Sequence, residues 1–187
     1  MTALGRSPAI AGIDFELPDG WWCLDLHDPQ LAERFDSLRV GGGVITAESE
    51  QRALSQLREL AERGASIALL RPADDSRPVA VCGGVFIRGG IDVDGVELYE
   101  ALELDGEPVA LGDLGGIPIV SHIRREPVDD RRSLPILHIT YFICAPRMCI
   151  VVKFVAPEIV SRNCIVNDVA NVISAVRVVH SDDGCPV

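Results

Sequence analysis

The sequence ILHITYFICAPRMCIVVKF, residues 136–154, carries the strongest structural signal in the chain. Two apolar segments of strand-like composition flank a short break at residues 145–148, which predicts a β-hairpin. Pairing the segments about that break places Thr140 opposite Lys153. Because side chains alternate between the faces of a strand, His138 and Val151 are expected on the same face as this pair.

The opposite face of the predicted hairpin is apolar throughout. Its side chains are Leu137, Ile139, Tyr141, Ile143, Ile150, Val152 and Phe154. Such a face is typical of a strand pair that packs on a dry core. The hairpin therefore has one face committed to the core and one mixed face.

Further elements are predicted on both sides of the hairpin. The segments Ile117–Arg125, Leu134–Ile143 and Cys149–Val155 indicate three consecutive antiparallel strands. Additional strands are expected at residues 15–17, 21–26, 66–70, 78–87 and 109–111, and helices at residues 29–38, 46–63, 95–104 and 157–173. Gly83-Gly84 indicates a bulge or close packing. This order predicts an α+β fold with an antiparallel sheet flanked by helices.

The length of 187 residues is most simply one domain, residues 1–187, with flexible ends at residues 1–13 and 181–187. The longest apolar run is interrupted by Pro146, Arg147 and Lys153, so no membrane insertion is expected. The N-terminus lacks the apolar stretch of a secretory signal. A cytoplasmic location is the resulting prediction.

Acidic residues dominate the first part of the chain. Of the 28 acidic residues, 20 precede Gly112, whereas only 9 of the 17 basic residues do, and the formal net charge is −11. Nucleic acids and anionic membranes are bound by clustered basic side chains that replace counterions. The charge distribution therefore argues against both kinds of partner.

The six cysteines never form a Cys-x-x-Cys pair and are expected to be mostly buried free thiols. Cys144 and Cys149 face each other across the predicted hairpin. They are interpreted as two unpaired core residues, with a strained, reducible disulfide as the alternative. No Gly-x-Ser-x-Gly or metal-ligand spacing occurs, and a Cys–His hydrolase would need an arbitrary choice among cysteines and histidines. We predict no catalytic residues, no metal and no cofactor.

The mixed face of the hairpin is the candidate ligand site. His138, Thr140 and Lys153 share it, and His122 can join them from the preceding strand. Two histidines, a threonine and the sole lysine form a semi-polar surface that suits a small ligand. The alternative interpretation is that these side chains are simply partly exposed, or satisfied beneath a helix.

Two other regions are candidates for binding a protein partner. Residues 92–107 are acidic, with Leu98 and Tyr99 interleaved, and are suited to a basic partner or simply to solvent. Trp21 and Trp22 point to opposite faces of a strand, so one indole is expected to be available as an anchor.

The order of elements resembles the PsbP-like and LpqN-like α/β/α sandwiches. The residues that carry this resemblance are Phe15-Glu16-Leu17-Pro18-Asp19-Gly20-Trp21, Pro118-Ile119-Val120, the hairpin at residues 136–154 and Val155-Ala156-Pro157. With the helix end at residues 61–65, the chain also resembles a group of uncharacterised actinobacterial proteins of similar length. That resemblance implies an association with secretion or cell-envelope systems and transfers no catalytic residue.

These observations predict a non-enzymatic binding or scaffold protein that engages a protein partner, and the resemblance implies a secretion-linked assembly as its setting. A small-ligand binder that uses the semi-polar face is the alternative, and a Cys/His hydrolase is the third class. An exposed edge strand would favour a homodimer.

Overall fold

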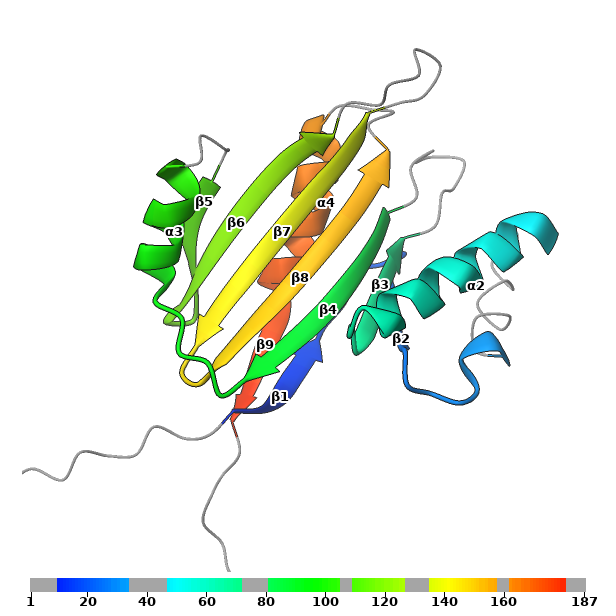
Figure 1. Ribbon diagram of the computed structural model, residues 1–187, viewed down its shortest axis with the longest axis horizontal. Helices are drawn as coiled ribbons and strands as arrows, with labels where there is room; N and C mark the ends of the chain where they lie inside the picture. The colour runs from blue at the N-terminus through cyan, green and yellow to red at the C-terminus, as the bar shows by residue number, and fades with distance from the viewer. Residues whose placement is uncertain are drawn as a thin grey trace, which may run out of the picture.

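Seven antiparallel strands form the central sheet of the protein in the computed structural model, which describes residues 10–33, 47–71, 81–104, 109–126, 135–157 and 162–180 (Figure 1). The strand order is β2-β3-β4-β8-β7-β6-β5. The strands are β2 (Trp22–Asp25), β3 (Ile67–Arg71), β4 (Val81–Gly89), β5 (Val109–Leu114), β6 (Ile117–Glu126), β7 (Ile136–Ala145) and β8 (Met148–Pro157).

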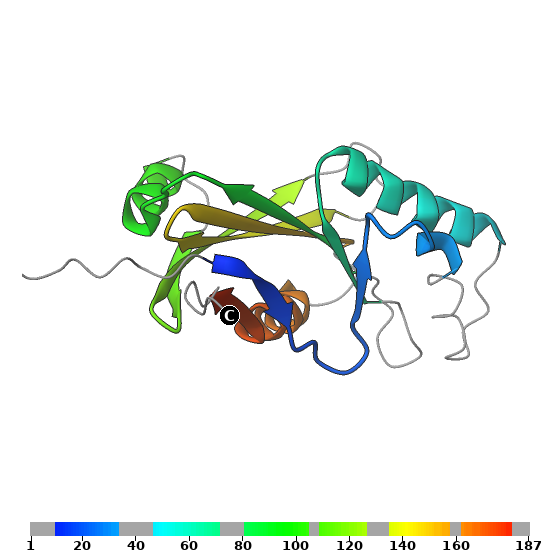
Figure 2. The same ribbon diagram turned by 90° about the horizontal axis from the view of Figure 1, so that it is seen from below.

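Helices lie on both sides of this sheet. Helix α4 (Arg162–Ser174) lies against one face, together with a two-stranded sheet of β1 (Ile10–Phe15) and β9 (Val176–His180). Helices α2 (Ala47–Glu62) and α3 (Gly95–Leu104) lie on the other side, at opposite ends of the strand order (Figure 2). The fold is α+β, as the sequence predicted.

The β7–β8 hairpin forms as expected because its turn residues suit a two-residue loop. Pro146 fixes φ at the first loop position, and Arg147 adopts a positive φ of 60° at the second. Thr140 lies opposite Lys153, which confirms the predicted register.

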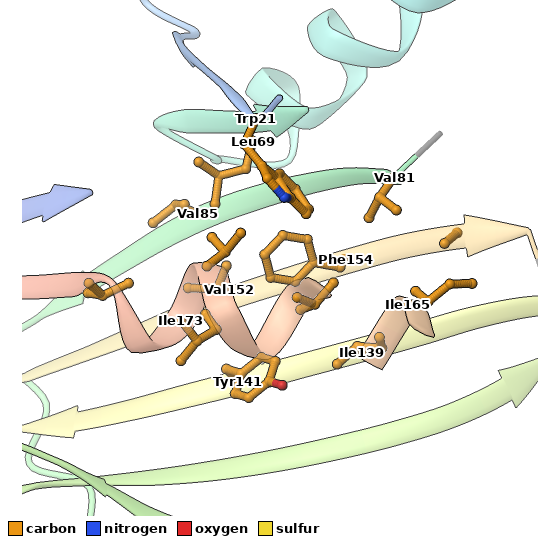
Figure 3. Packing of buried hydrophobic residues seen from close by; sticks show 14 of the residues in the cluster. Trp21, Leu69, Val81, Val85, Ile139, Tyr141, Val152, Phe154, Ile165 and Ile173 are labelled. Carbon is orange, nitrogen blue, oxygen red and sulfur yellow. The ribbon is translucent and has the colours of Figure 1, made fainter. Parts of the chain in front are cut away.

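The main core lies between the sheet and α4 (Figure 3). All seven apolar side chains predicted for the core face of the hairpin are buried. Trp21 packs edge-on against Phe154, with ring centroids 5.8 Å apart, and α4 contributes Ile165, Val169, Val172 and Ile173. Arg71 is the buried charged residue of the described core, and its guanidinium forms an ion pair with Asp168 of α4.

Close packing explains the two adjacent glycines of β4. A Cβ atom on Gly83 would lie 2.6 Å from the Phe154 ring, and one on Gly84 would lie 3.1 Å from Leu60 of α2. Both glycines pair in regular register with their neighbours, so close packing and not a bulge accounts for them.

Helices α2 and α3 have the ends that the sequence predicted. Gly64 adopts a φ of 88° just after α2, as a C-terminal glycine should. The Asp94 carboxylate accepts hydrogen bonds from the backbone N–H groups of Val96 and Glu97 at the start of α3.

The chain ends differ most from the sequence prediction. Residues 10–13, expected in a flexible end, belong to β1, which also replaces the predicted strand at residues 15–17. Residues 176–180, expected to lead into a frayed tail, form β9 and pair with β1. The last helix begins at Arg162, because Pro157 completes β8. Half of the predicted helix at residues 29–38, from residue 34 onward, lies outside the described residues.

Candidate functional site

The face of the sheet away from α4 is the candidate functional site. Among the described elements, α2 lies over this face at the β2–β3–β4 end, and α3 lies over β5, β6 and the end of β7 that carries Cys144 (Figures 1 and 2). Between these two helices, the part of the face that contains Thr140 and Lys153 has no described helix above it. Residues here remain partly accessible in the middle of a seven-stranded sheet, where a covered face would be buried.

The strand register arranges this face in rows that cross the strands. We call the surface made by these rows the open face. Its first row contains Cys82, Val155, His138 and Arg124, and its second row contains Gly84, Lys153, Thr140, His122 and Val109. Its third row contains Phe86, Val151, Phe142, Val120 and Leu111, and its fourth row contains Arg88, Cys149 and Cys144. The first two rows are largely polar and the third is apolar. The open face therefore has a polar half beside an apolar stripe.

The polar half contains all four predicted ligand residues. Thr140 is flanked by Lys153 on β8 and His122 on β6, and His138 lies two residues from Thr140 on the same strand. The predicted shared face is thus confirmed, whereas ligand binding there stays a prediction. His138 Nε2 lies 2.8 Å from Glu126 Oε2, with both side chains near the surface.

Lys153 lies at the centre of the open face. Its ammonium lies 5.9 Å from the centroid of the Phe86 ring, within the range of a cation–π contact. Neither Lys153 nor the exposed Arg124 forms an ion pair with a described residue. Two cations are therefore presented without a carboxylate partner in the described part of a strongly acidic chain.

The apolar stripe was missed by sequence reasoning. It runs from Phe86 through Val151, Phe142 and Val120 to Leu111. Its Phe86 end requires the pairing of β4 with β8, whereas its other four residues lie on the consecutive strands β5 to β8. Strands β4 and β8 are far apart in sequence, so no local pattern reports their contact.

The two hairpin cysteines lie at the end of the open face near α3. Both are free thiols, directly opposite each other, and both are buried. Burial, the neighbouring Cys149 and the Asp94 carboxylate raise the pKa of the Cys144 thiol to about 11. Burial also raises the pKa of Cys82 to about 11. A raised pKa keeps these two thiols protonated at neutral pH.

The predicted partner-binding residues lie apart from one another. Trp21 is buried in the main core, so its indole is not a surface anchor, while Trp22 is half-buried in the edge strand β2. Leu98 and Tyr99 are half-buried on α3, and the Tyr99 hydroxyl lies 3.1 Å from Glu103 Oε1. The more exposed residues of α3 include Val96, Glu97 and Glu100.

Within the described residues, no group of three or more histidine, cysteine or acidic side chains is arranged to hold a metal ion. The described helices also include none that is long and apolar enough to cross a membrane.

The fold is similar to known structures at low sequence identity. No protein-family model matches the sequence, and neither does any curated protein. A crystal structure from Bacteroides thetaiotaomicron VPI-5482 aligns with a TM-score of 0.49 and 10% identity over 93% of this chain, which spans about half, 47%, of that longer chain.

Two further structures bear on the resemblance noted from the sequence. LpqN, which is involved in cell envelope biogenesis of Mycobacterium tuberculosis, aligns with a TM-score of 0.45 and 16% identity over 94% of this chain and 87% of LpqN. The solution structure of cyanobacterial PsbP from Synechocystis sp. PCC 6803 gives 0.43 and 12% over 95% and 96%. The chain is thus structurally similar to the LpqN and PsbP folds.

Proposed function

We propose that this chain is a non-enzymatic binding protein that engages a protein partner through the open face. The observation that carries this proposal is a sheet face on which cations that have no ion-pair partner among the described residues lie beside an apolar stripe. Lys153 lies in the row next to Phe142 and Val151, and Arg124 lies one row further from them. The complementary partner surface would carry carboxylates beside apolar side chains.

The net charge of −11 does not prevent such a contact. At physiological ionic strength the screening length is about 8 Å, so local cations act on a docked surface more strongly than distant carboxylates. The breadth of the face also favours a protein over a small molecule. Small-molecule sites surround most of their ligand, whereas Lys153 and Val155 are exposed on a face that spans several strands.

Capture from the lysate of the organism tests the proposal. The bait is the full chain, compared with Lys153→Glu on the open face and with Arg177→Glu as a matched control. Arg177 is an exposed cation of β9, in the layer on the other side of the sheet. We expect a partner that is enriched by wild type and Arg177→Glu, released by high salt, and lost from Lys153→Glu.

Two results would count against this assignment. An unchanged set of captured proteins with Lys153→Glu would overturn the use of the open face. Binding of a dialysable component from the lysate, with no protein enriched, would support the small-ligand alternative on His122, His138, Thr140 and Lys153. The cytoplasmic location and the link to secretion remain predictions from the sequence.

A further inference from the structure

The facing thiols of Cys144 and Cys149 form a second feature of the open face. Only the loop residues Pro146 and Arg147 separate β7 from β8, and Ala145 pairs with Met148 beside this loop. In a hairpin of this kind the residues flanking the loop form a hydrogen-bonded pair. The next pair, Cys144 and Cys149, is then a non-hydrogen-bonded pair, in which side chains approach most closely.

This position suits a disulfide with little movement of the backbone. Cα atoms of a non-hydrogen-bonded antiparallel pair lie about 4.5 Å apart. Disulfides span Cα separations of roughly 4.4 to 6.8 Å, so the pair lies at the short end of the permitted range. The two thiols already share a hydrogen bond. A bond formed here would be strained and therefore readily reduced.

The start of α3 lies against this pair. A Cβ atom on Gly95 would approach Pro118 Cβ to 2.6 Å and Cys144 Cβ to 3.8 Å, so the helix start lies directly on both residues. The connection before α3 is tied to the hairpin turn. Arg147 N–H donates to Asp92 Oδ1 over 2.7 Å, and Gly90 N–H donates to the Arg147 carbonyl over 2.8 Å.

We propose that Cys144 and Cys149 form a reversible disulfide site whose access is controlled by the start of α3. The oxidant is a low-molecular-weight disulfide, RSSR. The Cys149 thiolate attacks one sulfur of RSSR and releases RS⁻, and the Cys144 thiolate then attacks the mixed disulfide at Cys149 and releases the second RS⁻. The two cysteine protons pass to the released thiolates, so two protein thiols are oxidised while RSSR is reduced to two RSH.

The order of attack follows from the environment of the two thiols. Burial raises the pKa of both, but the hydrogen bond from Cys144 lowers the pKa of Cys149 and so opposes that rise. Cys149 is therefore the easier thiol to ionise. Because both side chains are buried beside Asp94, oxidation should be slow while α3 is seated and fast when its start moves away.

Peptide mapping of the full chain tests the disulfide directly. Trypsin cuts after Arg147, so Cys144 and Cys149 separate into peptides 133–147 and 148–153 unless a disulfide joins them. The protein is incubated with oxidised glutathione, quenched with N-ethylmaleimide and digested without reductant. We expect the joined peptides after oxidation and their loss after treatment with dithiothreitol.

Two glycine variants test the role of α3. Gly95→Ala inserts a methyl group between α3 and Pro118, whereas Gly89→Ala adds the same group where nothing lies within 4 Å. We expect the joined peptides to form several-fold faster in Gly95→Ala than in wild type, with Gly89→Ala unchanged. If Gly95→Ala does not fold, Asp92→Ala removes the tie to Arg147 and should accelerate the reaction in the same way.

The proposal is overturned if peptides 133–147 and 148–153 stay unjoined in wild type and in the folded α3 variant. Control by α3 is overturned if Gly89→Ala accelerates oxidation as much as Gly95→Ala. These outcomes do not depend on what binds the open face, so they leave the proposed function to its own test.

Discussion

The two faces of the central sheet differ in what their side chains do. On the face toward α4, apolar residues of the strands from β3 to β8 pack beneath this helix and Trp21. On the open face, Thr140 is half-exposed and Lys153 is exposed although both lie on central strands. Antiparallel sheets commonly pack one face on a core and leave the other partly exposed, and this difference supports our proposal that the open face is the binding surface.

Adjacent residues of β8 give the largest expected contrast. Phe154→Ala removes a ring that is 1% exposed and packs on Trp21, and should lower the free energy of unfolding by roughly 3 to 5 kcal/mol. Lys153→Ala, one residue earlier on the open face, should change it by about 0.5 kcal/mol or less. Urea unfolding of both variants measures the contrast, and equal losses would show that the open face is also structural.

The ion pair between Arg71 of β3 and Asp168 of α4 is a charged contact on the covered face, and its removal tests how much it stabilises the fold. Asp168→Asn leaves the buried Arg71 guanidinium without its anionic partner and should destabilise the fold by roughly 1 to 3 kcal/mol. The partial exposure of Asp168 keeps the effect below that of a fully buried pair. In the double variant Arg71→Met/Asp168→Leu much of the stability should return, and a further loss would contradict this account.

Gly83 tests how tightly the side chains of the covered face are packed. In Gly83→Ala the new methyl group meets the Phe154 ring, so we expect a loss of roughly 1 to 3 kcal/mol of unfolding free energy. Gly89→Ala on the same strand meets nothing within 4 Å and serves as the control. Similar stabilities for the two variants would mean that the ring yields easily.

A pH dependence of stability is also expected from the thiols of the open face. The pKa values of Cys82 and Cys144 are raised from 9.0 to about 11, so their contribution to stability is present below pH 9 and is lost as the pH rises through 11. We expect the free energy of unfolding to decline over this range. Unfolding of Cys82→Ala/Cys144→Ala should show a shallower decline, and an equal slope would assign the effect to other groups.

Local signals in the sequence predicted the hairpin, α2 and α3 well. The turn at Pro146 and Arg147 fixes the register that places Thr140 opposite Lys153. All of these residues belong to one hairpin and are therefore close in sequence. In contrast, β1 and β9 pair residues from opposite ends of the chain, and residues 176–180 resemble a tail until β1 is placed beside them.

The candidate site divides in the same way. Its four polar residues were found because alternation along β6, β7 and β8 is local, and consecutive strands pair with one another. The extension of the apolar stripe to Phe86 was not predictable in this way, because it depends on β4 lying next to β8. The sequence predicted that one of the two indoles is available but not which one, since the burial of Trp21 depends on its contact with Phe154, which lies on a distant strand.

Lys153 offers the most direct test of the open face as the binding surface, because it is the sole lysine of the chain. The measurement is its rate of acetylation by an amine-reactive ester in concentrated lysate of the organism and in buffer of the same pH and salt. We predict slower acetylation in the lysate, with the buffer rate restored at high salt. Equal rates in lysate and buffer would contradict the claim that a partner covers this face.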